Sequence, residues 1–303
     1  MRSRNQYLAT FGFYALVQAF ALWMVTILPS DYRAFENPSD PVNPILYFVM
    51  ILAMTGVLLL LIKLGHGNIL RAIFIGAMAV AMFSILMPLF YLIVPDGTVA
   101  FVWGACAAAI LGLLLVVFPE WYVVDITAFL VGVGATAILG LSLGILPAFI
   151  LLIILMVYDA ISVYKTKHML TLAEGVIDMK LPVLFVIPKK MDYKLGEETL
   201  ELKDREKDPE RTTMMMGVGD AVITGILIVS ARVYLPSASA YFQWADALVT
   251  VGAFIGGCIG FLVLMRYVST GRPQAGLPLL CGGTIAGYII SYLLVFQNFS
   301  FGF

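Results

Sequence analysis

The sequence has little charge and few cysteines. Charged residues make up 12% of its 303 residues, whereas hydrophobic residues make up 61%, and the mean hydropathy is +0.98. Such a composition excludes an ordinary soluble domain. The three cysteines, Cys106, Cys258 and Cys281, fall in apolar segments without C-x-x-C spacing. Neither a disulfide framework nor a zinc site is therefore expected, and we interpret them as packing residues.

Histidine is also scarce, which restricts the possible chemistry. Residues 140–144 match the G-x-S-x-G pattern of serine hydrolases, but His66 and His168, the two histidines, are predicted on the opposite side of the membrane from Ser142. No H-E-x-x-H pattern occurs. A Ser/His dyad is excluded, no metal site or cofactor is indicated, and the scattered basic residues do not form a nucleic-acid-binding patch.

The sequence does contain long uncharged hydrophobic segments. Backbone groups find no partners in hydrocarbon, so only helices or a closed barrel can span it, and these segments lack the alternation of barrel strands. A span needs about 20 apolar residues. Hydropathy with Gly and Pro breaks therefore predicts an all-α polytopic membrane protein with nine transmembrane helices: Tyr7–Leu28, Pro44–Leu64, Ile69–Val94, Val99–Phe118, Trp121–Ser142, Leu146–Tyr164, Thr213–Tyr234, Ala245–Val268 and Leu277–Phe296.

The fifth and sixth spans are divided by small residues and proline. Residues 126–158 are uncharged and too many for one helix, and Gly140, Gly144 and Pro147 offer the break. Asp125 lies near one end of the fifth span. We group the chain as one transmembrane domain, 1–303, with spans one to five in 1–145, spans six and seven in 146–234 and spans eight and nine in 245–303.

The basic residues predict the orientation. With a cytoplasmic N-terminus, sixteen lysines and arginines fall inside, ten of them between Lys165 and Arg211, and only Arg33 and Arg232 fall outside. The loop 168–212 is then cytoplasmic and the C-terminus extracytoplasmic. Within that connection, residues 181–187 have strand character, whereas residues 196–211 are densely charged and predicted to be solvated.

Two aspartates, Asp159 and Asp220, lie inside hydrophobic spans. A carboxylate at bilayer depth costs roughly 2.5 to 3.5 kcal/mol on insertion scales, so it usually serves a function. Asp159 precedes Lys165 by six residues, about 9 Å, and Asp220 follows Arg211 by nine, about 13 Å. Spans six and seven are consecutive, so they can be antiparallel neighbours whose carboxyls meet at similar depth.

Two adjacent carboxyls suit peptide hydrolysis. Like charges that close cannot both ionise, so one carboxyl keeps its proton and the pair supplies an acid and a base. The base can activate a water while the acid polarises the scissile carbonyl. Gly217 and Gly219 leave a turn without side chains before Asp220, which admits a close helix or an extended peptide. The Tyr158 hydroxyl can hydrogen-bond within the site, or the ring can be an interfacial aromatic.

These motifs resemble the presenilin and signal-peptide-peptidase family of intramembrane aspartyl proteases. The resemblance rests on Tyr158-Asp159 in the sixth span and Gly217-Val218-Gly219-Asp220 in the seventh, covers essentially the whole chain, and looks closest to archaeal homologues. It implies a presenilin-like bundle with Asp159 and Asp220 catalytic. The family's Pro-Ala-Leu motif is replaced by Ala275-Gly276-Leu277-Pro278, where small residues and a proline can still leave backbone groups open near the dyad.

The leading hypothesis is therefore an endopeptidase that cuts transmembrane helical substrates within membrane lipid, with homo-oligomerisation possible. Taken alone, a buried aspartate can instead be a structural partner of Arg232 or of a tyrosine. The paired carboxylates also admit a proton- or cation-conducting channel or transporter. The altered Ala275-Gly276 admits a third alternative, a catalytically silent helix-binding protein.

Overall fold

The computed structural model describes residues 2–63, 67–118, 120–166, 184–188, 213–268 and 274–303. The described part of the chain is mostly helical and contains one short two-stranded sheet. Most of the predicted cytoplasmic loop 168–212, including the charged segment 196–211, lies outside the described residues. By its contacts the chain forms two compact units, which are residues 1–13, 53–135 and 168–219, and residues 14–52, 136–167 and 220–303.

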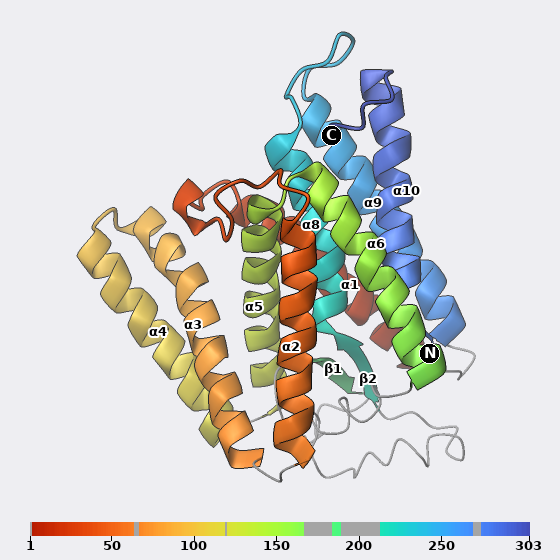
Figure 1. Ribbon diagram of the computed structural model, residues 1–303. Coiled ribbons are helices and arrows are strands. Elements are labelled where there is room, and N and C mark those ends of the chain that lie inside the picture. Colours follow the sequence, from red (N-terminus) through yellow and green to blue (C-terminus); the bar gives the residue numbers. More distant parts are fainter. Residues whose placement is uncertain (1, 64–66, 119, 167–183, 189–212, 269–273) are drawn as a thin grey trace. The chain divides into compact units, whose positions relative to one another are not determined.

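Nine α-helices occur in the described residues, one for each predicted span and in the same order (Figure 1). Seven of them are long and apolar enough to cross a membrane. In the described part of the chain, the apolar stretch Asn43–Leu58 of α2 is shorter than these seven and α8 is 17 residues long, so the count of nine spans is not established. The helices are α1 (Arg2–Met24), α2 (Asn43–Lys63), α3 (Gly67–Ile93), α4 (Gly97–Val117), α5 (Trp121–Ser142), α6 (Ile145–Ile161), α8 (Val218–Tyr234), α9 (Ala245–Val268) and α10 (Leu277–Phe296).

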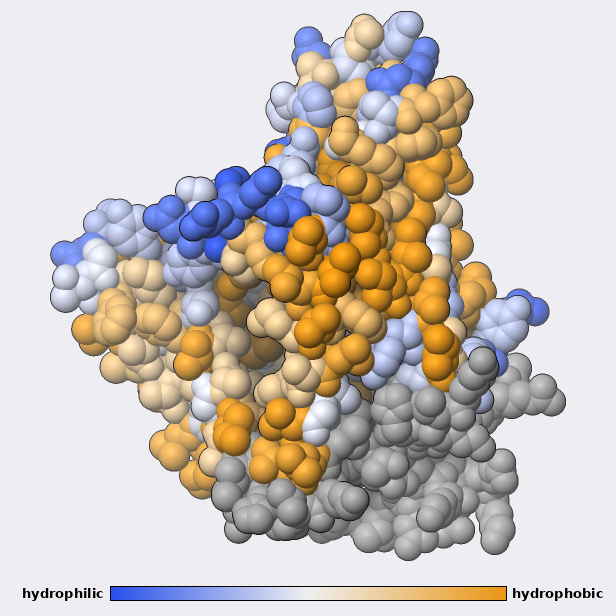
Figure 2. All heavy atoms as spheres, in the orientation of Figure 1, coloured by the Kyte–Doolittle hydropathy of each residue, from blue (hydrophilic) through white to orange (hydrophobic). Residues whose placement is uncertain are grey.

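The surfaces of these helices are apolar, as expected for helices surrounded by lipid. Large hydrophobic side chains such as Val80, Leu113 and Ile259 are more than half exposed. Figure 2 shows hydrophobic residues along the helix flanks that face the viewer. Exposed apolar area of this extent is a liability in water, where it drives association, but it is favourable against hydrocarbon.

The first unit contains the α3–α4 pair and the sheet. Gly104 of α4 faces the backbone of Met87 in α3, where an added Cβ would lie 3.0 Å from the Met87 Cα. The two helices can therefore approach closely. Strands β1 (Leu184–Pro188) and β2 (Thr213–Gly217) pair antiparallel, with Leu184 opposite Gly217 and Pro188 opposite Thr213.

The strand β2 corrects the predicted seventh span. That span was expected to begin at Thr213, but its first five residues are extended and the helix begins at Val218. Met214–Met216 are as apolar as helix residues, and a short apolar run does not distinguish helix from strand by hydropathy. The strand character predicted for 181–187 is confirmed for the described residues of β1.

The second unit contains α6, α8, α9 and α10 around one apolar core. The break predicted at Gly140–Pro147 is confirmed, because α5 ends at Ser142 and Gly144 precedes α6. Glycines let the last two helices of this unit pack closely. A Cβ on Gly256 of α9 would collide with the carbonyl oxygen of Gly283 in α10, and these helices lie side by side (blue in Figure 1).

Candidate functional site

Asp159 lies on the buried face of α6. Leu152 and Leu155 precede it by seven and four residues and share that face, as helical periodicity requires. The Asp159 side chain is 5% exposed. A carboxyl at this burial needs hydrogen-bond partners, since an unpaired buried polar group is costly.

The partner of Asp159 is the N-terminus of α10. The backbone amide of Leu277, the first residue of α10, donates to the Asp159 Oδ2 at 3.1 Å, and the Gly276 amide also interacts with this carboxyl. Gly276 is the N-cap residue and has no side chain to cap the helix, and Pro278 has no N–H group. The first-turn amides that a helix leaves unsatisfied are therefore available to Asp159.

Asp220 lies in the first turn of α8, in the same unit, and is partly buried. Its Oδ2 would lie 3.3 Å from a Cβ added to Gly276. The Asp159 and Asp220 carboxyls are close enough for their charges to repel each other, and the buried Cys281 side chain lies near both. The structure thus brings the two aspartates together, with the Gly276–Leu277 segment facing both.

Two further side chains hold the first turn of α8. Gln18 of α1 is fully buried and donates from its Nε2 to the carbonyl of Ala221 at 2.7 Å. The Thr224 hydroxyl donates to the carbonyl of Asp220 at 2.9 Å. Sequence reasoning did not identify Gln18, although a lone amide within a predicted span is a detectable signal. Cys281, interpreted as a packing residue, is buried in the apolar core, four residues after Leu277 and on the same face of α10.

Tyr158 and the residues just before Asp220 were also predicted to shape the site. The Tyr158 ring packs edge-to-face against Phe48 of α2, with centroids 5.7 Å apart. Gly217 ends β2 and Val218 begins α8, and both belong to the first unit with Gly219. Among the described residues, no heavy atom lies within 4 Å of a Cβ added to Gly219.

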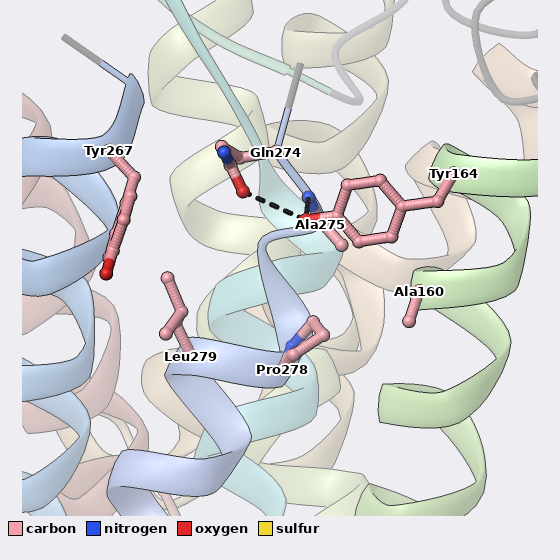
Figure 3. A pocket seen from close by; sticks show the side chains of 7 residues that line it. All are labelled: Ala160, Tyr164, Tyr267, Gln274, Ala275, Pro278 and Leu279. Carbon is pink, nitrogen blue, oxygen red and sulfur yellow. Dashed lines mark hydrogen bonds between the residues drawn. The ribbon is translucent and has the colours of Figure 1, made fainter. Parts of the chain in front are cut away.

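A cavity of about 250 Å³ borders the Gly276–Leu277 segment (Figure 3). The Tyr164 hydroxyl donates to the Gln274 Oε1 at 2.9 Å and accepts from the Ala275 amide at 3.4 Å. Ala275 itself is buried. Tyr164 and Gln274 were not predicted, and their separation by 110 residues left no local pattern to find. The cavity is lined by Ala160, Tyr164, Tyr267, Gln274, Ala275, Pro278 and Leu279.

Arg232, the basic residue of α8, is engaged away from the two central aspartates. Arg232 forms its ion pair with Asp246, so the alternative that it is the structural partner of Asp220 has no support. Within the described part of the chain, no cluster of three or more potential metal ligands occurs.

Comparisons with known proteins agree over nearly the whole chain. A family model described as signal-peptide peptidase, presenilin aspartyl protease matches residues 11–297. The chain is similar to a solved presenilin family intramembrane aspartate protease in space group C222, with 32% identity, a TM-score of 0.70, and coverage of 95% of this chain and 99% of that chain. It is also similar to such a protease solved in space group P2, with 34% identity, a TM-score of 0.68, and coverage of 95% and 98%. A search of curated proteins finds no match.

Proposed function

Because this chain belongs to the signal-peptide peptidase and presenilin family of aspartyl proteases, we propose that Asp159 and Asp220 are its catalytic acid–base pair. The protein is an intramembrane aspartic endopeptidase with several membrane-spanning helices, and it acts on membrane-embedded substrates. The observation that carries the proposal is the placement of one peptide segment, Gly276–Leu277, against both carboxyls.

The two carboxyls divide the chemistry between them. At close range one holds a proton while the other is ionised. The ionised carboxyl takes a proton from a water, which attacks the scissile carbonyl as the protonated carboxyl donates to the carbonyl oxygen. In the resulting gem-diol intermediate the C–N bond then breaks. The carboxyl that took the water's proton gives it to the departing amine nitrogen, and the other carboxylate takes a proton from a gem-diol hydroxyl, which restores the starting protonation state. No covalent enzyme intermediate is required.

The substrate is a transmembrane helix that unwinds locally before its peptide bond reaches the dyad. The freed strand pairs with backbone near Leu277 and Pro278 or with the sheet. The Leu277 amide already donates to Asp159 and the Val186 amide to Asp125, so neither amide is available to a substrate strand. This favours addition of the strand to β2. Gly219, which has no side chain, supports passage of an extended chain before Asp220. Tyr158, Val218, Ala275 and Pro278 shape this site.

The chain spans the membrane nine times as one domain, 1–303, with α2 and α8 as the two spans beyond the seven long apolar helices. The N-terminus and the loop 168–212 are cytoplasmic, following the excess of basic residues there. The C-terminus is extracytoplasmic. Labelling of single cysteines introduced at each end with a membrane-impermeant reagent tests this orientation.

A cleavage assay in liposomes tests the function. Wild-type protein is expected to cut a reconstituted single-span peptide, Asp159→Ala and Asp220→Ala are expected to abolish the cut, and a hydroxyl-bearing transition-state mimic should inhibit the wild type. Asp246→Asn, which alters a carboxyl paired with Arg232, is the matched control and should remain active. Ion flux that depends on Asp159 and Asp220 without proteolysis would instead identify a channel or transporter.

A further inference from the structure

Strand β1 is fixed to two helices of its own unit at three consecutive residues. The Phe185 ring stacks on Phe13 of α1, with centroids 5.0 Å apart. The Val186 amide donates to the Asp125 Oδ1 of α5 at 2.8 Å. The Ile187 carbonyl accepts from the Gln6 Nε2 of α1 at 2.9 Å. Together these contacts oppose both sliding of β1 along its own axis and its displacement from the two helices.

Asp125 has no other described role. It lies in a candidate membrane span and is 2% exposed. Its Oδ2 has no hydrogen-bond partner among the described residues. An apolar residue at this position would insert into the membrane more favourably. The hydrogen bond to β1 therefore accounts for a carboxyl at this buried position.

The bond to Asp125 also defines the edges of the sheet. In an antiparallel pair, each residue turns its N–H and C=O to the same edge, and successive residues alternate. The Val186 amide given to Asp125 thus faces away from β2. Asp125 closes this edge of β1. Among the described residues no further strand pairs with the outer edge of β2, so the sheet can be extended there.

We propose that Asp125 and Gln6 are positioning residues that fix the strand register of β1, and thereby select the peptide bond that is cut. This inference rests on the proposed function. β1 sets the register of β2, and β2 ends at Gly217, three residues before Asp220 in the chain. A substrate strand added to β2 is therefore placed by the register of β1. A slip that keeps side chains on the same face moves a strand by two residues, about 7 Å.

The test is the position of the cut, measured by mass spectrometry of the products from a single-span peptide in liposomes. Asp125→Leu and Gln6→Leu should each yield products displaced by two residues and lower kcat/KM by about threefold to tenfold, as expected for one lost hydrogen bond. Asp125→Asn keeps an acceptor oxygen and should cut at the wild-type position. Thr127→Val is the matched control, because Thr127 is buried in the same helix and its hydroxyl donates to the carbonyls of Val123 and Val124 in that helix.

Unchanged cut positions in Asp125→Leu and Gln6→Leu would overturn the proposal, as would an equal shift in Thr127→Val. If Asp125→Leu does not elute as folded protein, Gln6→Leu decides alone, because it leaves the carboxyl of Asp125 in place. Failure of the proposed function looks different. In that case the wild type does not cut, or it cuts equally with Asp159→Ala and Asp220→Ala, and both proposals fall together.

Discussion

Asp159 in the second unit and Asp125 in the first have similar local geometry but different neighbours. Both are buried in α-helices and both accept a backbone amide from a residue distant in the chain, Leu277 and Val186 respectively. Asp159 interacts with a second carboxyl, Asp220, whereas Asp125 contacts a strand. Burial with a backbone hydrogen bond is therefore no mark of catalysis by itself. What distinguishes Asp159 is the second carboxyl beside it, that of Asp220, which the proposed acid–base mechanism requires.

Replacing each carboxyl by its amide should separate the two regions most strongly. Asp159→Asn or Asp220→Asn removes a member of the proposed acid–base pair and should lower kcat by about 10³-fold or more. Asp125→Asn keeps the oxygen that accepts from Val186 and should stay within about threefold of wild type. Initial cleavage rates in liposomes, compared at equal amounts of folded protein, measure both effects. A similar loss in all three variants would contradict the distinction.

The second largest effect is expected where α10 meets the dyad. A Cβ on Gly276 would lie 3.3 Å from the Asp220 Oδ2 and 3.5 Å from the Leu264 Cδ2, so the branched side chain of Gly276→Val must displace the carboxyl. A displacement of about 1 Å can cost about 10²-fold in rate. We expect kcat to fall by about tenfold to 100-fold with little change in thermal stability.

Gly282→Val is the control for this substitution. Gly282 lies on the same helix, and no described heavy atom lies within 4 Å of its added Cβ. Its rate should match the wild type. If both valine variants lose the same activity, the effect belongs to α10 as a whole, and Gly276 has no special relation to Asp220.

The same comparison shows what sequence can predict. The bounds of α5, α9 and α10 agree with the predicted spans, because charged residues, Gly and Pro mark where apolar runs end. The two aspartates were singled out because a charge within such a run is conspicuous. The tie between Asp125 and Val186 crosses 61 residues, and that between Gln6 and Ile187 crosses 181, so no local pattern indicates either. The start of α8 was wrong because β2 is defined by its pairing and not by its hydropathy.

A tether on the dyad side provides the last and smallest test. The Tyr164 hydroxyl holds Gln274 and Ala275, which lead into the Gly276–Leu277 segment, much as Asp125 and Gln6 hold β1. However, the Tyr164 side chain is 57% exposed, so water can replace its bonds and their net contribution is small.

Tyr164→Phe should therefore raise KM by about twofold to fivefold and leave kcat unchanged, because the cavity wall loosens while the carboxyls stay in place. The measurement is the cleavage rate against the mole fraction of substrate in the membrane. Tyr241→Phe alters an exposed tyrosine outside the cavity lining and should leave both constants unchanged. A loss of kcat in Tyr164→Phe as large as that in Gly276→Val would mean that the hydroxyl acts on the dyad itself, and the parallel between the two tethers would not hold.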